Sequence, residues 1–163
     1  MSRILGIDPG SRSTGYGLIE QSETGIDYVA SGVIRTQHEG FPARLKEIYS
    51  GIDLVVAEYA PDECALEEVF VAHNPSSALK LGQARGAALV AVMSHEVAVS
   101  EYAARRVKSM IVGTGKATKD QVKYMVKALL HLDGRLSQDA SDALAIAICH
   151  AFSKKTDDWT IGR

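Results

Sequence analysis

The residues of this chain that are best suited to chemistry are acids in apolar surroundings. One acid ends a hydrophobic run near the amino terminus, a pair interrupts a second apolar run, and two more open a segment that continues as ALAIAICHAF. These acids are Asp8, the pair Glu67 and Glu68, Asp139 and Asp142. A carboxylate in such surroundings is costly unless a basic side chain or a metal ion pairs with it. The sequence therefore predicts that these acids share a positive partner.

Some of these acids also have a simpler structural interpretation. Asp8 precedes Pro-Gly and could be a turn residue, and Asp139 could be a first-turn acid that the helix dipole favours. Asp142 is harder to explain in this way, because the segment after it is apolar on every side. Glu67 and Glu68 point to opposite faces of a strand, so only one of them can lie on the same face as Asp8. The pattern alone does not say which.

A cluster of carboxylates favours a hard divalent cation, Mg²⁺ or Mn²⁺. Zinc is disfavoured because the histidines are scattered, and no Gly-x-Ser-x-Gly motif supports a serine nucleophile. Carboxylates that hold two metal ions about 4 Å apart suit in-line displacement at a phosphodiester. The histidines are His38, His73, His95, His131 and His150.

The charge distribution supports a phosphate polymer as the substrate. The chain carries a net charge of −2, but the segment from 103 to 135 carries +6 and the remainder −8. Lys119, Lys123 and Lys127 recur every fourth residue on one face of a predicted helix, which is either a phosphate-binding surface or an ordinary solvated one. The basic residues of the segment are Arg105, Arg106, Lys108, Lys116, Lys119, Lys123, Lys127 and Arg135.

The elements that must position these residues alternate along the chain. Strands are predicted over 3–8, 14–20, 27–36, 64–71 and 97–102, and helices over 42–59, 75–95, from Thr118 onward and from about Ser137. Asn74-Pro75 and the pair Thr118 and Gln121 have the pattern of helix caps. Three strands followed by alternating helices and strands predict an α/β fold, with a mixed five-stranded sheet and helices on both faces.

Small residues dominate the predicted helix over 75–95. Ala78, Gly82 and Gly86 lie four residues apart and form a flat stripe. A glycine inside a helix costs about 1 kcal/mol relative to alanine, so close packing must offset that cost. The helix packs tightly either on its own sheet or on a symmetry mate across a two-fold axis.

The bulk properties indicate one domain of ordinary size. The chain has 163 residues, of which 46% are hydrophobic. Residues 1–152 form the predicted domain, and residues 153–163 a tail that we expect to be mobile. Cys64 and Cys149 lie in apolar patterns, so a disulfide is not expected and a reducing cytoplasm fits. No secretory leader and no membrane span are expected.

Five blocks in register resemble the RuvC-type Holliday junction resolvases of bacteria. They read GIDPGSRSTGYG, ALEEVF, NPSSALKLGQARG, EYAARRVK and DASDALAIAICH, and together they extend over roughly residues 3–152. The resemblance implies a ribonuclease H-like fold and a homodimer that cuts four-way DNA junctions during recombination and repair, with paired nicks in strands of like polarity. It also suggests an association with the RuvA–RuvB branch-migration proteins.

The resemblance also implies roles for particular residues. The catalytic and metal-binding carboxylates fall on Asp8, Glu67, Asp139 and Asp142, which favours Glu67 over Glu68. They would hold Mg²⁺ or Mn²⁺, as two ions per active site. The DNA-binding residues expected from the family and from the basic segment are Lys108, Lys119, Arg105, Lys123 and Phe70. Phe70 would act on bases at the junction centre, although it could instead be a core residue that ends its strand.

Two other functions are compatible with parts of the pattern. An actin-like or sugar-kinase-like ATPase also opens with a strand, an acid, a glycine-containing loop and another strand, but needs two large lobes. A junction-binding protein without catalysis is the other alternative, and the complete set of four acids disfavours it.

Overall fold

The computed structural model describes residues 1–68 and 74–161, with side chains as far as residue 156. Its sheet has five strands in the order β3-β2-β1-β4-β5. The pairs β1–β2 and β2–β3 are antiparallel, whereas β1–β4 and β4–β5 are parallel. The strands are β1 (Ser2–Asp8), β2 (Ser13–Gln21), β3 (Ile26–Arg35), β4 (Glu63–Glu67) and β5 (Ala98–Tyr102). The predicted mixed five-stranded sheet is therefore confirmed.

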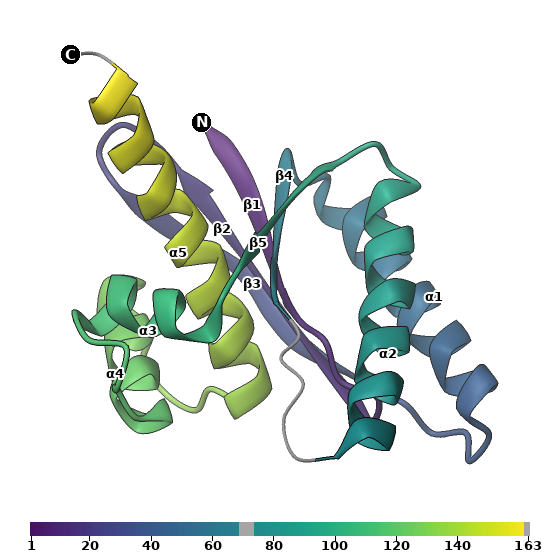
Figure 1. The fold of residues 1–163 in the computed structure, drawn as a ribbon. Helices are drawn as coiled ribbons and strands as arrows, with labels where there is room; N and C mark the ends of the chain where they lie inside the picture. The colour runs from purple at the N-terminus through teal and green to yellow at the C-terminus, as the bar shows by residue number, and fades with distance from the viewer. Residues whose placement is uncertain (69–73, 162–163) are drawn as a thin grey trace.

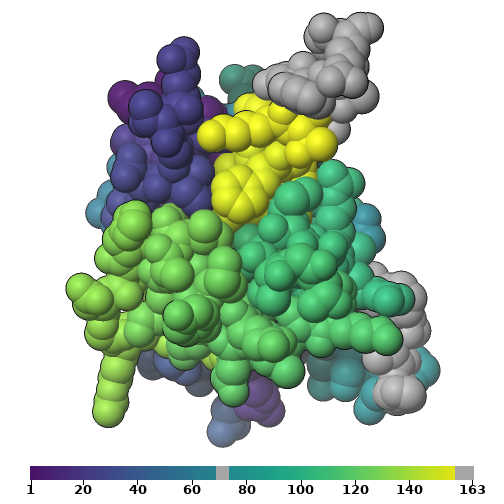
Figure 2. Space-filling view, turned by 90° about the vertical axis from the view of Figure 1, so that its left-hand side faces the viewer, coloured from purple at the N-terminus to yellow at the C-terminus, as the bar shows by residue number. Residues whose placement is uncertain are grey.

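Helices cover both faces of this sheet, as the sequence predicts (Figure 1). The long helix α5 (Gln138–Ile161) crosses one face, and α3 (Ala104–Val112) and α4 (Lys119–Leu129) pack beside it. The other face is covered by α1 (Phe41–Tyr59) and α2 (Pro75–Met93), which pack on each other. Figure 2 shows α3 and α4, in green, as the outer layer of one side of the molecule, with part of α5 in yellow above them.

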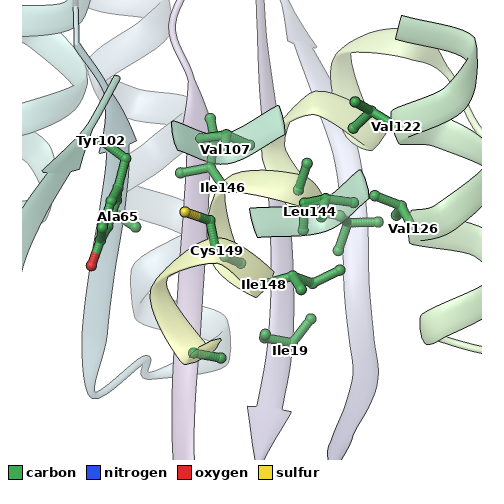
Figure 3. Packing of buried hydrophobic residues seen from close by; sticks show 14 of the residues in the cluster. Ile19, Ala65, Tyr102, Val107, Val122, Val126, Leu144, Ile146, Ile148 and Cys149 are labelled. Carbon is green, nitrogen blue, oxygen red and sulfur yellow. The ribbon is translucent and has the colours of Figure 1, made fainter. Parts of the chain in front are cut away.

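Alternation along the strands divides the apolar side chains between two cores. In β1, Ile4 faces α5, whereas Leu5 and Ile7 face α1 and α2, and all three are fully buried. Figure 3 shows the first core, in which Leu144 and Ile148 of α5 lie between the strands and the side chains of α3 and α4. Helix α5 is therefore apolar nearly all round because it is enclosed between two layers.

Glycines in β1 and β2 allow α5 to lie directly on the sheet. A Cβ atom at Gly15 would come 2.1 Å from the main-chain oxygen of Asp139, and one at Gly6 would come 2.0 Å from that of Ala143. A Cβ atom at Gly17 would collide with Leu144. These glycines bring the first turns of α5, with their acids, against the end of β1.

The predicted helix starts are confirmed by their capping bonds. The Asn74 side chain accepts hydrogen bonds from the amides of Ser76 and Ser77 at the start of α2. Thr118 and Gln121 form a reciprocal capping box at the start of α4.

Two features differ from the sequence prediction. Helix α3 was not predicted, although Val107 and Ile111 are four residues apart and buried, and Gly113 ends the helix in a left-handed conformation. Helix α5 also continues past the predicted domain boundary between residues 152 and 153. Ser153 is buried and Lys154 contacts Glu63 on β4. Side-chain contacts therefore extend the domain beyond 152.

Both cysteines are buried and free, so the prediction that they form no disulfide is confirmed. Within the described ranges, no helix is long and apolar enough to cross a membrane.

Candidate active site

The carboxyl-terminal ends of β1 and β4 lie side by side, and each ends in an acid. The two strands are parallel and pair Ile7 with Leu66, so Asp8 and Glu67 follow at the same level. Both side chains lie on the face that α5 covers. Glu68 comes one residue later, is exposed, and uses its amide to bond the carbonyl of Tyr102. The structure thus places Glu67, not Glu68, beside Asp8.

A cavity of about 280 Å³ opens above these strand ends. Asp8 and Glu67 line its floor, Asp142 enters from α5, and two lysines, Lys108 of α3 and Lys119 of α4, complete the polar lining. Its apolar wall consists of Ala104, Val107, Val122, Ala145 and Ile146. Five of the predicted site residues are therefore gathered around one cavity by β1, β4, α3, α4 and α5.

The negative charges in this cavity repel one another. Burial, together with the charges of Glu67, Asp142 and Asp139, raises the pKa of Asp8 to about 7, although Lys119 opposes the shift. Burial and Asp142 likewise raise the pKa of Glu67, against the lowering effect of Lys119 and Lys108. A divalent cation would relieve this repulsion, because it favours the ionised form of each carboxyl group.

Each carboxylate oxygen of Asp142 has a polar side chain beside it. The amide of Gln138, one turn earlier on α5, donates to its Oδ1 over 2.7 Å, and Nζ of Lys119 lies 3.4 Å from its Oδ2. The carboxylate raises the pKa of Lys119, with smaller contributions from Asp8 and Glu67. Lys119 is therefore charged and lies against this carboxylate cluster.

Asp139 is close enough to act on Asp8 electrostatically, but its carboxylate is engaged elsewhere. The hydroxyl of Ser13, on β2, donates to Oδ2 of Asp139 over 2.9 Å. Ser13 is the first residue of β2, three residues after the Asp8-Pro9-Gly10 segment. The bond thus ties the start of α5 to the same end of the sheet as Asp8.

The donor set fits a hard cation such as Mg²⁺ or Mn²⁺, because it consists of carboxylate oxygens that repel one another. In the part of the chain that the structure describes, no three His, Cys, Asp or Glu side chains already converge on a single metal position. Asp139 is turned to Ser13, and Asp142 to Gln138 and Lys119. The chemistry of the residues thus matches a metal site, while two of the acids are engaged by neighbouring side chains.

Two of the predicted DNA-binding residues lie outside the cavity lining. Arg105 is exposed on α3, and Lys123 is half-buried on α4, so both flank the cavity without lining it. Phe70 lies outside the described residues.

Sequence reasoning missed the partners that hold the acids. Ser13 and Gln138 bond to Asp139 and Asp142 directly. Gln138 could have been found from its spacing, because it precedes Asp142 by four residues and so shares its helical face. Ser13 gave no comparable signal, because its contact spans 126 residues of sequence.

Comparisons with known proteins point to one family. The family model described as crossover junction endodeoxyribonuclease RuvC matches residues 4–150. RuvC of Photobacterium profundum is 56% identical over 156 residues, which cover 96% of this chain and 90% of that protein.

Solved structures share the fold of this chain. RuvC of T. thermophilus, in complex with a Holliday junction substrate, has a TM-score of 0.89 at 31% identity, covering 96% of this chain and 97% of that one. The yeast mitochondrial Holliday junction resolvase Ydc2 shares the fold, with a TM-score of 0.68 at 16% identity over 92% of this chain and 78% of that one. These neighbours confirm the predicted ribonuclease H-like fold. The chain therefore belongs to the RuvC family of crossover junction endodeoxyribonucleases.

Proposed function

We propose that this protein is a metal-dependent endonuclease that cuts four-way DNA junctions. The observation that carries the proposal is the cavity in which Asp8, Glu67 and Asp142 face Lys108 and Lys119. Family membership supports the class of reaction, and the T. thermophilus relative was solved with a Holliday junction substrate.

The four carboxylates Asp8, Glu67, Asp139 and Asp142 would hold Mg²⁺, or Mn²⁺ in its place, as two ions. When bound, such ions activate a water molecule and neutralise charge on the phosphate. The reaction is hydrolysis: an oxygen–phosphorus bond forms from water, and the bond from phosphorus to the 3′ oxygen breaks. The proton from water goes through solvent to the leaving 3′ oxygen, so atoms and charge balance.

The chain's own cations would hold the phosphate. Lys119 and Lys108 lie on the side of the cavity formed by α4 and α3, opposite the strand ends. A phosphate drawn between them would lie over the carboxylates. Lys119 would then exchange its contact with Asp142 for the phosphate and stabilise the charge that develops on it.

A cleavage assay with two matched substrates tests this proposal. A labelled four-way junction and a linear duplex of the same sequence are incubated with Mg²⁺, with Mn²⁺ and with a chelator. We expect nicks in the junction only, and only with metal. Cleavage in the chelator, equal cleavage of the linear duplex, or tight junction binding without cleavage would each contradict it.

We also propose that the protein works as a homodimer through the outer face of α2. Leu79, Val90 and Met93 are 71%, 57% and 53% exposed, and they lie on one face of the helix together with Gly82 and Gly86. Among the residues that the structure describes, a Cβ atom at either glycine would meet no atom within 4 Å. The interpretation that these two glycines pack on their own sheet is therefore wrong.

The sheet side of α2 carries a different set of residues, because Ala84, Ala88, Ala91 and Val92 face inward. The helix is thus apolar on two opposite faces, and the outer one suits an isologous contact with a second copy. Two copies would supply two active sites for the two cuts that a four-way junction needs.

Mixed dimers test this assembly. Wild-type subunits are combined with an excess of Asp8→Asn subunits and offered a junction on a supercoiled plasmid. Mixed dimers should leave singly nicked junctions. A protein that sediments as a monomer on the junction and still makes paired cuts would contradict the proposal.

A further inference from the structure

Arg85 connects α2 to the strand that carries Glu67. Its side chain is only 16% exposed, although it is an arginine on an outer helix. Its Nε donates to the main-chain oxygen of Glu67 over 3.3 Å, and its Nη2 lies 2.8 Å from Oε1 of Glu101 on β5. The contact with Glu101 is an ion pair between opposite charges, and it lacks the geometry of a hydrogen bond. One guanidinium therefore joins α2, β4 and β5.

These contacts lie on the face of the sheet opposite the cavity. Glu67 pairs with Tyr102, whose ring belongs to the core under α5. Glu101, one residue earlier on β5, points to the α2 side by strand alternation. Arg85 thus holds the backbone of Glu67 from behind, while the carboxylate of Glu67 projects into the cavity in front.

Glu67 is the last residue of β4, and its side chain projects into the cavity. Just beyond it, the amide of Glu68 bonds the carbonyl of Tyr102 on β5. A strand end is a place where a backbone shift is easy, so a further contact with its main chain affects where the side chain lies.

Arg85 contacts the main chain of Glu67, whereas Lys108 and Lys119 line the cavity into which the Glu67 carboxylate projects. The hydrogen bond from Arg85 to the carbonyl therefore fixes where the Glu67 side chain begins.

We infer that Arg85 is a positioning residue, which fixes Glu67 for metal binding and ties the strand end to α2. The inference rests on the proposed function, and it adds a physical link between the proposed dimer helix and the active site. Arg85 precedes Gly86, which lies on the outer face of α2. Contact between two copies through that face would therefore also restrict the movement of the Arg85 side chain that bonds Glu67.

Arg85→Gln and Arg85→Lys test the inference, with Arg44→Gln as the matched control. Arg44 also donates from Nε to a main-chain oxygen, that of His38, over 2.7 Å, but it lies in the first turn of α1 and does not line the cavity. For each variant we would measure sedimentation, melting, junction affinity in chelator, the single-turnover rate as Mg²⁺ is varied, and Mn²⁺ binding without DNA by electron paramagnetic resonance.

We expect Arg85→Gln to keep its dimer mass and junction affinity while its single-turnover rate and Mn²⁺ affinity fall about 10–100-fold, as for other residues that orient metal ligands. Arg85→Lys keeps the charge near Glu101 but loses the planar guanidinium that contacts Glu67 and Glu101 through two nitrogens. Its single-turnover rate should therefore fall between those of Arg85→Gln and wild type. Arg44→Gln should match wild type throughout.

Wild-type rate and Mn²⁺ affinity in Arg85→Gln would overturn the inference. A rate loss matched by equal losses of dimer mass or junction affinity would also overturn it, because Arg85 would then be only structural. If Arg85→Gln does not fold, Arg85→Lys decides by the same criteria. If the wild-type protein cuts no junction, the proposed function fails, but the Mn²⁺ titration still tests the link from Arg85 to Glu67.

Discussion

The amide of Gln138 donates a 2.7 Å hydrogen bond to Oδ1 of Asp142, one turn further along α5. With Nζ of Lys119 near Oδ2, this bond fixes both oxygens of the carboxylate. An asparagine at 142 could still accept from Gln138, but its other group would be an NH₂ facing the ammonium of Lys119. The charge of Asp142, rather than its size, is therefore what the site depends on.

Charge-removing substitutions at the four acids should abolish cleavage and leave junction binding largely intact. The variants are Asp8→Asn, Glu67→Gln, Asp139→Asn and Asp142→Asn. Each removes negative charge from the proposed metal site, whereas the cations that would contact DNA remain. Cleavage and gel-shift assays on one junction check this. Glu68→Gln is the control, because Glu68 is exposed and does not line the cavity, and it should retain most of the activity.

The loss of folding stability at acid pH should depend on Glu63, which is remote from the proposed metal ligands. Burial would raise its pKa, but hydrogen bonds from Lys154, His150 and Ser2 outweigh burial and lower the pKa to about 2. A carboxyl group with a lowered folded-state pKa stabilises the fold above its unfolded value, near 4.5, and loses that contribution as the pH falls towards 2.

Melting temperatures of Glu63→Gln and wild type, measured from pH 7 to pH 3, check whether the ionised form of Glu63 stabilises the fold. The variant should melt well below wild type at pH 7, and the gap should narrow as the pH falls below about 4.5. A difference in melting temperature that stays constant from pH 7 to pH 3 would contradict this prediction. It would mean that the ionised carboxylate of Glu63 stabilises the fold no more than the protonated one.

The sequence predicted the sheet well, because its strands are short, apolar and bounded by turn residues. It could not choose between Glu67 and Glu68, because side chains alternate between the two faces of a strand. Only the register of β4 against β1 shows that Glu67 lies on the same face as Asp8. Helix α3 was missed because only Val107 and Ile111 mark its buried face among basic residues. Contacts such as that of Arg85 with Glu67 depend on tertiary packing, which has no local signature.

A methyl group at Gly15 should disturb both the fold and the site. The added Cβ would lie 2.1 Å from the main-chain oxygen of Asp139 and 2.6 Å from its main-chain carbon, and backbone cannot move aside as the end of a flexible side chain can. We expect Gly15→Ala to destabilise the protein by about 1–3 kcal/mol in urea unfolding, as overpacking does, and to slow cleavage by moving Asp139. Gly25→Ala is the matched control, because a Cβ there meets nothing within 4 Å. Equal stability of the two variants would contradict this account of how α5 is seated.

The three lysines along α4 should set part of the salt dependence of junction binding. Lys119 lies beside Asp142, and Lys127 donates to the main-chain oxygen of Gly134 over 2.6 Å, so neither is simply solvated. Each phosphate contact contributes about 0.9 to the slope of log affinity against log salt on duplex DNA. Replacing Lys119, Lys123 and Lys127 with alanine should therefore flatten the slope by up to about 3 if all three contact phosphates. An unchanged slope would show that this face of α4 does not meet the DNA.

The outer stripe of α2 allows a substitution that separates assembly from folding. A Cβ atom at Gly82 or Gly86 meets none of the described residues within 4 Å, so a leucine there has room within one subunit. Replacing a helical glycine should even stabilise the isolated helix by about 1 kcal/mol. Across a close two-fold contact, the same leucine would hold the two helices apart. We therefore expect Gly82→Leu and Gly86→Leu to keep their circular dichroism and melting temperature at low concentration, yet to sediment as monomers at concentrations where wild type is dimeric. Gly82→Ala should have a weaker effect, because it adds a single methyl group. Dimers of unchanged affinity in both leucine variants would place the interface elsewhere.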